Sequence, residues 1–327
     1  MVYVNQENFR HYYFVIATAH SPIQKNGNIL QNGALYTLRG KLIPHSLRTS
    51  GISGDSFRNQ NAQKLNFFEI IRILIGCIKA RRFLLNNYYC GPWFYVFGHF
   101  LLETLTRIGL HENINNPNLV FHTMDSSAFH QSVFPYQKRL IDLLGFKNSK
   151  IVLLTNHSFL LFNVKVLLPQ VHFPTHISPL TPQVFQRITS CRKSSLDLGS
   201  KIFLSRSKLH PLHQRIPLGI IRELEILMQK SGFELLHPET LSVDDQISAI
   251  SNAKYIAGPQ GSALHLSVFG HPKIKVIEFG DELRTSTPNY FQKELCIQFD
   301  QELIFFPFDN NLKSFNFIDL EAFLKSL

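Results

Sequence analysis

Short apolar runs alternate with amphipathic segments along the chain, and this alternation is the first guide to its fold. In the first 180 residues, strand-like runs at 11–19, 33–43, 81–89, 119–123 and 150–155 are separated by helix-like segments at 66–78, 97–110 and 134–146. Strands that alternate with helices are typical of an α/β sandwich with a largely parallel sheet. Residues 44–64 are rich in Ser, Gly, Asn and Gln and predict a loop.

The same alternation restarts after residue 200. Strand-like runs at 201–205, 233–238, 254–258 and 273–280 flank helix-like segments at 217–232, 242–253 and 262–270. We therefore predict two α/β domains in tandem, over 1–180 and 201–312, joined by a linker over 181–200 in which a helix precedes the polar stretch "SCRKSSLDLGS". A C-terminal helix over 313–327 is expected to pack back on the N-terminal domain. Ligands of open α/β sheets bind beyond the carboxyl ends of the strands, so residues at those ends are the first candidates for a site.

Composition fits a globular, cytosolic protein. The 327 residues are 44% hydrophobic and 17% charged, and the four cysteines form no CxxC pair. The N-terminal "MVYVNQENFRHYY" lacks the pattern of a signal peptide. The most apolar window, 67–78, is too short to span a bilayer and contains Glu69 and Arg72. It predicts a packed helix or an interfacial one.

The formal charge of +10 is unevenly distributed. Residues 1–200 contain 20 Lys and Arg against 8 Asp and Glu, whereas residues 201–327 contain 13 against 15. A basic N-terminal part favours an anionic partner, such as an acidic polysaccharide, an anionic membrane surface or a nucleic acid, although an inert basic surface has the same composition. Nucleic-acid binders interleave aromatic and basic residues, and the nearest example, "RRFLLNNYY" at 81–89, alternates like a strand.

The stretch "GPQGSALH" joins a predicted strand to a predicted helix. Small residues at such a turn let backbone N–H groups approach an anion, and the helix start adds a partial positive charge. A tight turn without a ligand has the same pattern, which is neither GxGxxG nor a Walker A motif. The candidate phosphate-binding residues here are Gly258, Gln260, Gly261, Ser262 and Ala263.

Basic and acidic residues follow the neighbouring strands. Ser205 and Arg206 come directly after the strand at 201–205, and Arg215 follows nine residues later. A guanidinium group can donate two parallel hydrogen bonds to phosphate oxygens and remains charged, so these residues could hold a diphosphate. The alternative is that they are ordinary basic residues of a surface loop. Glu239 and Glu278 are strand-end carboxylates that could accept hydrogen bonds from ribose hydroxyls. An acid at a helix start is the alternative for Glu239.

His99 and Glu103 are four residues apart on the helix predicted over 97–110. A His/Glu pair on a cleft wall could serve as a general base and its orienting partner, while a buried histidine satisfied by a glutamate has the same spacing. No Asp-x-Asp, GxSxG or HExxH motif is present. The sequence therefore predicts no metal site for a nucleotide-sugar and no cofactor.

Taken in order, these motifs resemble those of glycosyltransferase family 61, which includes bacterial capsule and surface-polysaccharide transferases. The matching segments are "GHFLLETLTRI", "PYQKRLIDLLGF", "LSRSKLHPLHQRIPLGIIRELEILMQKSGFELLHPETLSVDDQI" and "GPQGSALHLSVFGHPKIKVIEF", within about 86–280. The chain departs from the family at Gln260, where a histidine is frequent, at Gln214–Arg215, where the family has two arginines, and at Arg222–Glu223, where it has Asn-Glu. These departures bear on the identity of the donor more than on the fold.

The resemblance implies a GT-B fold of two facing Rossmann-like doubly wound domains, with donor and acceptor on the C-terminal and N-terminal domains respectively. It implies a metal-independent, inverting transfer of a sugar from a nucleotide-sugar, with a UDP-sugar the expected donor, to a glycan or lipid-linked glycan. An acidic glycan would be complementary to the basic charge of residues 1–200. Glu103 or His99 would deprotonate the acceptor, Ser205, Arg206, Arg215 and the 261–263 turn would hold the diphosphate, and Glu239 would hold the ribose. The enzyme would be cytoplasmic and in contact with the inner membrane surface, and it would bind no nucleic acid.

Two other readings of the sequence stay open. One is a non-catalytic glycan- or nucleic-acid-binding protein on a degenerate GT-B fold, and the other is a different nucleotide-dependent enzyme of the doubly wound class. Binding of a nucleotide-sugar together with its turnover would separate the transferase from both.

Overall fold

A computed structural model describes residues 9–18, 34–46, 64–123, 132–155, 157–172, 176–193, 196, 198–210, 214–282 and 286–327. Most of the loop expected over 44–64 lies outside these residues. The chain forms two compact units, Met1–His176 and Ile177–Leu327, each built around its own sheet. Both units are mixed α/β structures. Within the described ranges, no helix is long and apolar enough to cross a membrane.

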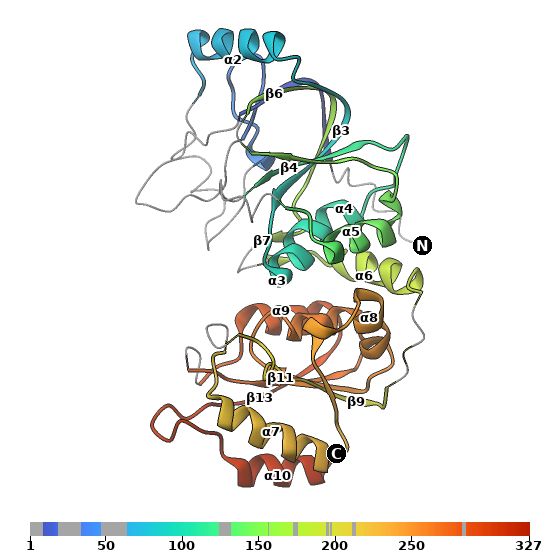
Figure 1. Cartoon of the computed structure of the whole chain (residues 1–327), viewed down its shortest axis with the longest axis vertical. Helices are drawn as coiled ribbons and strands as arrows, with labels where there is room; N and C mark the ends of the chain where they lie inside the picture. Colours follow the sequence, from blue (N-terminus) through green and yellow to red (C-terminus); the bar gives the residue numbers. More distant parts are fainter. Residues whose placement is uncertain are drawn as a thin grey trace. The chain divides into compact units, whose positions relative to one another are not determined.

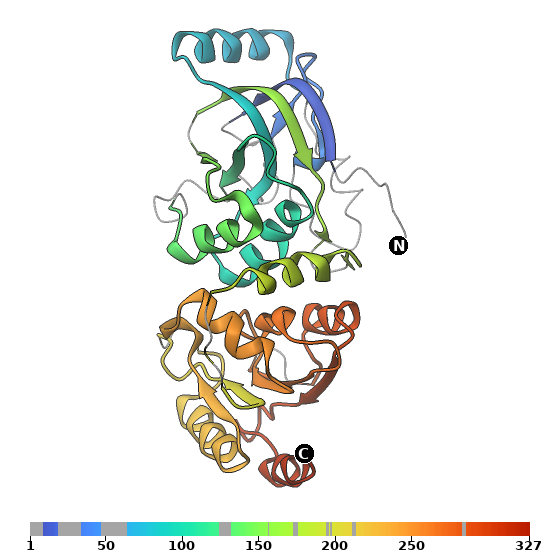
Figure 2. The same cartoon turned by 90° about the vertical axis from the view of Figure 1, so that its right-hand side faces the viewer.

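The sheet of the first unit has six strands in the order β2-β1-β6-β3-β4-β5. The strands are β1 (Phe9–Ala17), β2 (Leu35–Tyr36), β3 (Phe83–Trp93), β4 (Asn118–Thr123), β5 (Ile151–Leu154) and β6 (Phe159–Leu167). Neighbouring strands from β6 to β5 are parallel, whereas β1 runs antiparallel to both β6 and β2. The sheet is therefore mixed, and Figure 2 shows how strongly β1, β3 and β6 curve.

Alternating side chains of these strands form two apolar layers. One contains Val15, Tyr89 and Val164, and the other contains Ile16, Tyr36 and Leu160. The second layer is covered by α2 (Phe67–Lys79), which Figure 1 shows at the end of the unit. The helix begins with a capping box, in which the side chains of Asn66 and Glu69 each accept the backbone N–H of the other residue.

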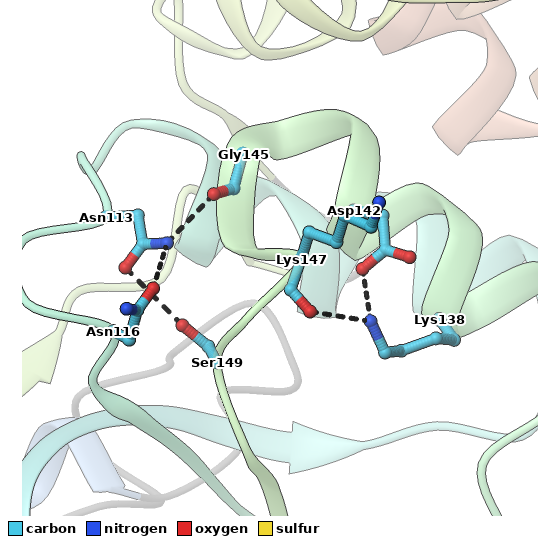
Figure 3. Close-up of polar contacts among 7 residues, drawn as sticks. All are labelled: Asn113, Asn116, Lys138, Asp142, Gly145, Lys147 and Ser149. Atoms are coloured by element: carbon cyan, nitrogen blue, oxygen red, sulfur yellow. Dashed lines mark hydrogen bonds and ion pairs between the residues drawn. The ribbon is translucent and has the colours of Figure 1, made fainter.

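Two further helical segments of the first unit contain π-helical turns. One runs through α3 (Phe97–His99), η2 (Phe100–Thr104) and α4 (Leu105–Gly109), and the other through α5 (Pro135–Ile141) and η4 (Asp142–Phe146). Figure 3 shows the polar contacts that close the second segment. Asn113 Nδ2 donates to the Gly145 carbonyl at 2.9 Å, and Lys138 Nζ contacts Asp142 and the Lys147 carbonyl. Such contacts satisfy carbonyls that a helix end leaves unpaired.

The second unit has a five-stranded, wholly parallel sheet in the order β10-β9-β11-β12-β13. The strands are β9 (Lys201–Leu204), β10 (Glu234–Leu236), β11 (Tyr255–Pro259), β12 (Lys275–Phe279) and β13 (Glu302–Phe306). In chain order this is 2-1-3-4-5, the arrangement of flavodoxin-like doubly wound domains. The strand order reverses between β9 and β11, and ligands of such folds bind at that switch point.

Helices cover both faces of this second sheet, as Figure 1 shows. On one face α7 (Leu218–Lys230) and α10 (Phe317–Lys325) contribute Ile221, Leu224, Leu320 and Leu324 to a core with Phe203. The other face carries α8 (Val243–Ser251), α9 (Tyr290–Gln298) and the 3₁₀ helix η7 (Leu264–Phe269). The C-terminal helix, expected to pack back on the N-terminal domain, thus lies in the core of the second unit.

The observed elements depart from the sequence prediction in several places. The region 33–43, expected as one strand, contains the two-residue β2 followed by a reversal at Gly40, whose φ is +72°. Helix α6 (Thr181–Ser190) is the helix expected at the start of the linker, but its Val184, Phe185 and Ile188 are buried. The α-helix expected over 262–270 is the six-residue 3₁₀ helix η7. The elements that were not anticipated include β6, α9, β13 and the two-residue strands β7 (Val171–His172) and β8 (His176–Ile177), which pair with each other.

Candidate functional site

The motifs of the second unit lie at the switch point of its sheet. Ser205 and Arg206 follow the last residue of β9, and Gln260 follows the last residue of β11. These two parallel strands are hydrogen-bonded neighbours, so the segments that leave their carboxyl ends start side by side. Two candidate regions more than fifty residues apart in the sequence are thereby brought into direct contact.

The contact is made by the Arg206 guanidinium. Its Nη1 donates a hydrogen bond to the main-chain oxygen of Gln260 at 3.0 Å. Gly261 follows with a φ of +134°, a conformation that L side chains rarely adopt. A Cβ added to Gly261 would lie only 2.2 Å from Arg206 Nη1. The glycine therefore meets two requirements at once, since it permits the backbone turn and leaves room for the guanidinium.

Charged groups of both signs surround Arg206. Burial lowers the pKa of Arg206 and the nearby Arg215 lowers it further, whereas the carboxylates of Asp281 and Glu239 raise it. Guanidinium groups remain charged at neutral pH, so two positive charges share this end of the sheet. Partial burial and the like charge of Arg215 both disfavour the charged form of Arg206, and a bound anion would relieve that cost.

Arg215 is held by a second contact across the unit. Its Nη1 lies 3.4 Å from Oδ2 of Asp281, whose side chain is fully buried, and its carbonyl accepts the backbone N–H of Glu282. The sequence reading did not single out Asp281. The available signal was its position two residues after β12, at the same edge of the sheet as the other candidates.

The Ser205 hydroxyl makes its hydrogen bonds within the protein. It donates to Oε1 of Glu225 on α7 at 2.5 Å, accepts the backbone N–H of Ser207, and is fully buried. The Ser207 hydroxyl also donates to Glu225 Oε1, at 2.6 Å. These bonds fix the segment that carries Arg206 against α7. Glu225 was another residue that the sequence reading missed.

Gln260 is almost entirely buried, at 1% exposure. Its backbone N–H donates to the Phe279 carbonyl at the end of β12, and its Nε2 donates to the Thr287 carbonyl at 3.3 Å. Its Oε1 is a buried acceptor with no hydrogen-bond partner among the residues that the structure describes. Such an acceptor is costly to leave unpaired, so it is a candidate contact for a donor group on a ligand.

The other small residues of the turn have different environments. Gly258 allows close packing of β11 on β9, because an added Cβ would lie 3.0 Å from the Leu204 carbonyl. Ser262 and Ala263 are partly exposed and immediately precede η7. The start of the short 3₁₀ helix offers only a partial positive charge, so the two arginines supply most of the positive charge here.

Two strand-end carboxylates lie in contrasting environments. Glu239 is exposed on the 3₁₀ helix η6 (Pro238–Thr240), close enough to Arg206 to raise its pKa. Glu278 is fully buried within β12, and its Oε1 accepts the backbone N–H of Asn289 at 3.0 Å, next to the start of α9. The structure therefore brings Glu239 toward the arginine pair and engages Glu278 in holding the segment before α9.

In the first unit, His99 and Glu103 form the pair that their spacing predicted. His99 Nδ1 lies 2.7 Å from Glu103 Oε1. The His99 side chain is 33% exposed, whereas that of Glu103 is 5% exposed. Glu103 is part of the π-helical turn η2, and π-bulges are frequent at functional sites. The histidine is thus the accessible member of the pair, and the buried carboxylate orients its ring through the hydrogen bond.

An aromatic ring and a buried arginine lie near this pair. The Phe94 ring lies 5.3 Å from the His99 ring between centroids. One turn beyond Glu103, the buried Arg107 donates to the His45 carbonyl at 3.2 Å and occupies the space that a side chain at Gly91 would need. No group of three or more His, Cys, Asp or Glu residues that could hold a metal ion occurs in the described part of the chain.

Part of this chain matches a known protein family. A family model for glycosyltransferase 61 matches residues 97–277. No curated protein matches the chain. The matched region covers more than half of the chain and contains both the His99–Glu103 pair and the Arg206–Gln260 contact, while Glu278 lies just beyond it.

The chain belongs to the glycosyltransferase 61 family. Membership of this family implies that the protein is a glycosyltransferase.

Proposed function

We propose that this protein transfers a sugar from a nucleotide-sugar, with a UDP-sugar the expected donor, to a hydroxyl of a glycan or lipid-linked glycan. The observation that carries the proposal is the Arg206–Gln260 contact at the switch point of a parallel sheet, inside the family match. Doubly wound domains bind nucleotides at this position, and paired guanidinium groups suit a diphosphate.

The donor would be held by the second unit. Arg206 and Arg215 would bind the diphosphate, with Ser262 and Ala263 offering backbone N–H groups beside them. The exposed carboxylate of Glu239 would accept hydrogen bonds from the ribose. Gln260 Oε1, a buried acceptor without a partner among the described residues, would accept a hydrogen bond from an N–H or O–H group of the nucleotide or the sugar. Ser205 would act indirectly, through the bonds that hold the Arg206 segment to Glu225.

The acceptor would be activated in the first unit. The exposures of the pair favour His99 as the base and Glu103 as the carboxylate that orients it, since His99 is the accessible member. The hydroxyl proton would pass to the imidazole as the oxygen bonds to the anomeric carbon. The bond from that carbon to the phosphate oxygen would break with inversion, and its electron pair would leave with the nucleoside diphosphate. The arginines would stabilise that charge in place of a metal ion.

The remaining finer assignments are part of the same proposal. They are a GT-B arrangement of the two units, a role in bacterial capsule or surface-polysaccharide synthesis, a cytoplasmic location, and partners that do not include nucleic acid. The basic composition of residues 1–200 supports an anionic acceptor, because opposite charge raises the local concentration of such a substrate.

Thermal-shift and hydrolysis assays with UDP-, GDP-, TDP- and CMP-sugars test the proposal. One nucleotide class is expected to stabilise the protein and to be slowly hydrolysed when the acceptor is absent. Stabilisation by a nucleotide-sugar without turnover of any acceptor would instead support a non-catalytic binding protein. Failure of all four classes to stabilise the protein would overturn the assignment of the donor site.

A further inference from the structure

Helix α2 has apolar residues on two sides. One side packs on the sheet, where Ile70 and Cys77 are buried and Ile73 and Leu74 are partly buried. Cys77 Sγ also donates to the Ser158 carbonyl at 3.2 Å. Packing in the core of the unit thus explains the apolar residues on this side of the helix. The other side exposes five large apolar side chains: Phe67, Phe68, Ile71, Ile75 and Ile78.

These five side chains form one continuous stripe. With 3.6 residues per turn, Phe67, Ile71, Ile75 and Ile78 recur on the same side of the helix, and Phe68 extends the stripe at its edge. Phe67 is 69% exposed and Phe68 is 81% exposed. Isolated exposed apolar residues are common on protein surfaces, whereas a stripe along a whole helix marks a contact surface.

The charges around the stripe indicate what it contacts. Arg72 and Lys79 are exposed beside it. Five basic residues occur from the start to the end of this region, namely Lys64, Arg72, Lys79, Arg81 and Arg82. The acid in the same region, Glu69, belongs to the capping box, where its carboxylate accepts the backbone N–H of Asn66. An apolar stripe bordered by basic residues is complementary to a surface that is apolar beneath a layer of negative charge.

We propose that α2 is an interfacial helix that binds the protein to the surface of an anionic phospholipid bilayer. The exposed Phe and Ile side chains enter the boundary between head groups and acyl chains, and Arg72 and Lys79 contact lipid phosphates. A helix of 13 residues is about 20 Å long, so it lies on the bilayer and does not cross it. This inference rests on α2 alone and does not depend on the proposed transferase activity.

Co-sedimentation of the full chain with vesicles tests the inference. We expect binding to phosphatidylcholine vesicles that contain about 30 mole per cent phosphatidylglycerol, weak binding to phosphatidylcholine alone, and loss of binding as salt is raised. The double change Phe67→Ser and Phe68→Ser should lower the partition coefficient more than about tenfold, because two large apolar side chains no longer enter the bilayer. The double change Arg72→Gln and Lys79→Gln should lower it about fivefold per charge, on the anionic vesicles only.

The matched control is Ile226→Ser with Ile318→Ser, which removes two exposed isoleucines from α7 and α10. This variant should bind vesicles like the wild type. Since all these side chains are exposed, circular dichroism and thermal unfolding should be the same for every variant. Absence of wild-type binding to anionic vesicles, or equal binding by the phenylalanine variant, would overturn the inference. Light scattering that shows a dimer dissociating in the phenylalanine variant, without vesicle binding, would assign the stripe to a second copy of this chain.

Discussion

The Arg206 guanidinium and the main chain of Gln260 are joined by a hydrogen bond of 3.0 Å across the switch point of the second sheet. The bond links the carboxyl ends of two adjacent parallel strands, the place where doubly wound domains hold nucleotides. It also fixes a partly buried cation beside a second arginine. The first two predictions concern this relationship.

Replacing Arg206 by Ala should weaken binding of the nucleotide-sugar by about 30-fold or more, since a charged hydrogen bond to phosphate contributes about 2 kcal/mol or more. Isothermal titration with the donor measures the loss. Arg10→Ala is the matched control, because Arg10 is an exposed arginine on β1 of the first unit, outside the family match. Equal donor affinity of the Arg206 variant and the wild type would remove the diphosphate assignment.

Gly261→Ala should displace the Arg206 guanidinium, because the new Cβ would lie 2.2 Å from Nη1 while the backbone keeps a φ of +134°. We expect weaker donor binding and a loss of about 1–3 kcal/mol in the free energy of unfolding. Urea unfolding and donor titration measure the two effects. Gly219→Ala is the control: nothing lies within 4 Å of its added Cβ, and alanine within α7 should stabilise the protein slightly. Unchanged donor binding in Gly261→Ala would show that the turn does not position Arg206 for the ligand.

Glu103→Gln should lower kcat about 10²–10⁴-fold and leave donor affinity unchanged, because the orienting carboxylate of the proposed base is lost. His99→Ala should have at least as large an effect. The control is Asp142→Asn, which removes the acid from another i, i+4 pair of the same unit, Lys138–Asp142, shown in Figure 3. Turnover by the His99 variant at the wild-type rate would exclude His99 as the base.

Ser205→Ala should cost about 1–2 kcal/mol of stability, since Glu225 loses a buried hydrogen-bond donor. Donor affinity should change much less than in Arg206→Ala. Chemical unfolding and donor titration distinguish the two roles. A loss of donor affinity as large as that of the arginine variant, with stability unchanged, would place the Ser205 hydroxyl on the ligand.

Stability should fall in mild acid because of His122. Its Nε2 lies 2.9 Å from the Thr18 carbonyl and its Nδ1 lies 2.7 Å from the Tyr89 hydroxyl. Burial lowers the pKa of His122 to about 4, whereas an unfolded histidine has a pKa of about 6.5. Between these values only the unfolded chain takes up the proton, so the free energy of unfolding decreases as pH falls from about 6.5 to about 4.

Urea unfolding at several pH values measures this dependence, with an upper limit of about 3 kcal/mol. His122→Gln should flatten the slope in this range even if it lowers stability overall. His11→Gln, at an exposed position of β1, should leave the slope unchanged. A slope equal to that of the wild type in the His122 variant would assign the acid sensitivity to other groups.

Local patterns in the sequence predicted many of the elements. Helix α7 and strands β9 and β11 fall close to their expected ranges, because their apolar periodicity is strong and their ends carry clear turn signals. β6 and β13 were missed, although Ser158 and Pro169 bound the apolar run of β6 and Pro307 follows that of β13. The antiparallel direction of β1 was also missed, because periodicity gives no information on the direction in which a strand pairs.

The sequence by itself determined the α/β class, the His99–Glu103 pair and the turn at 258–263, since each depends on neighbours within a few residues. It also identified Arg206, but could not place it. Only the tertiary structure decided that Arg206 meets Gln260 and Gly261, that Ser205 binds Glu225, and that α2 keeps one apolar side exposed. The physical reason is that these relationships join residues distant in sequence, whose proximity is set by strand order and packing.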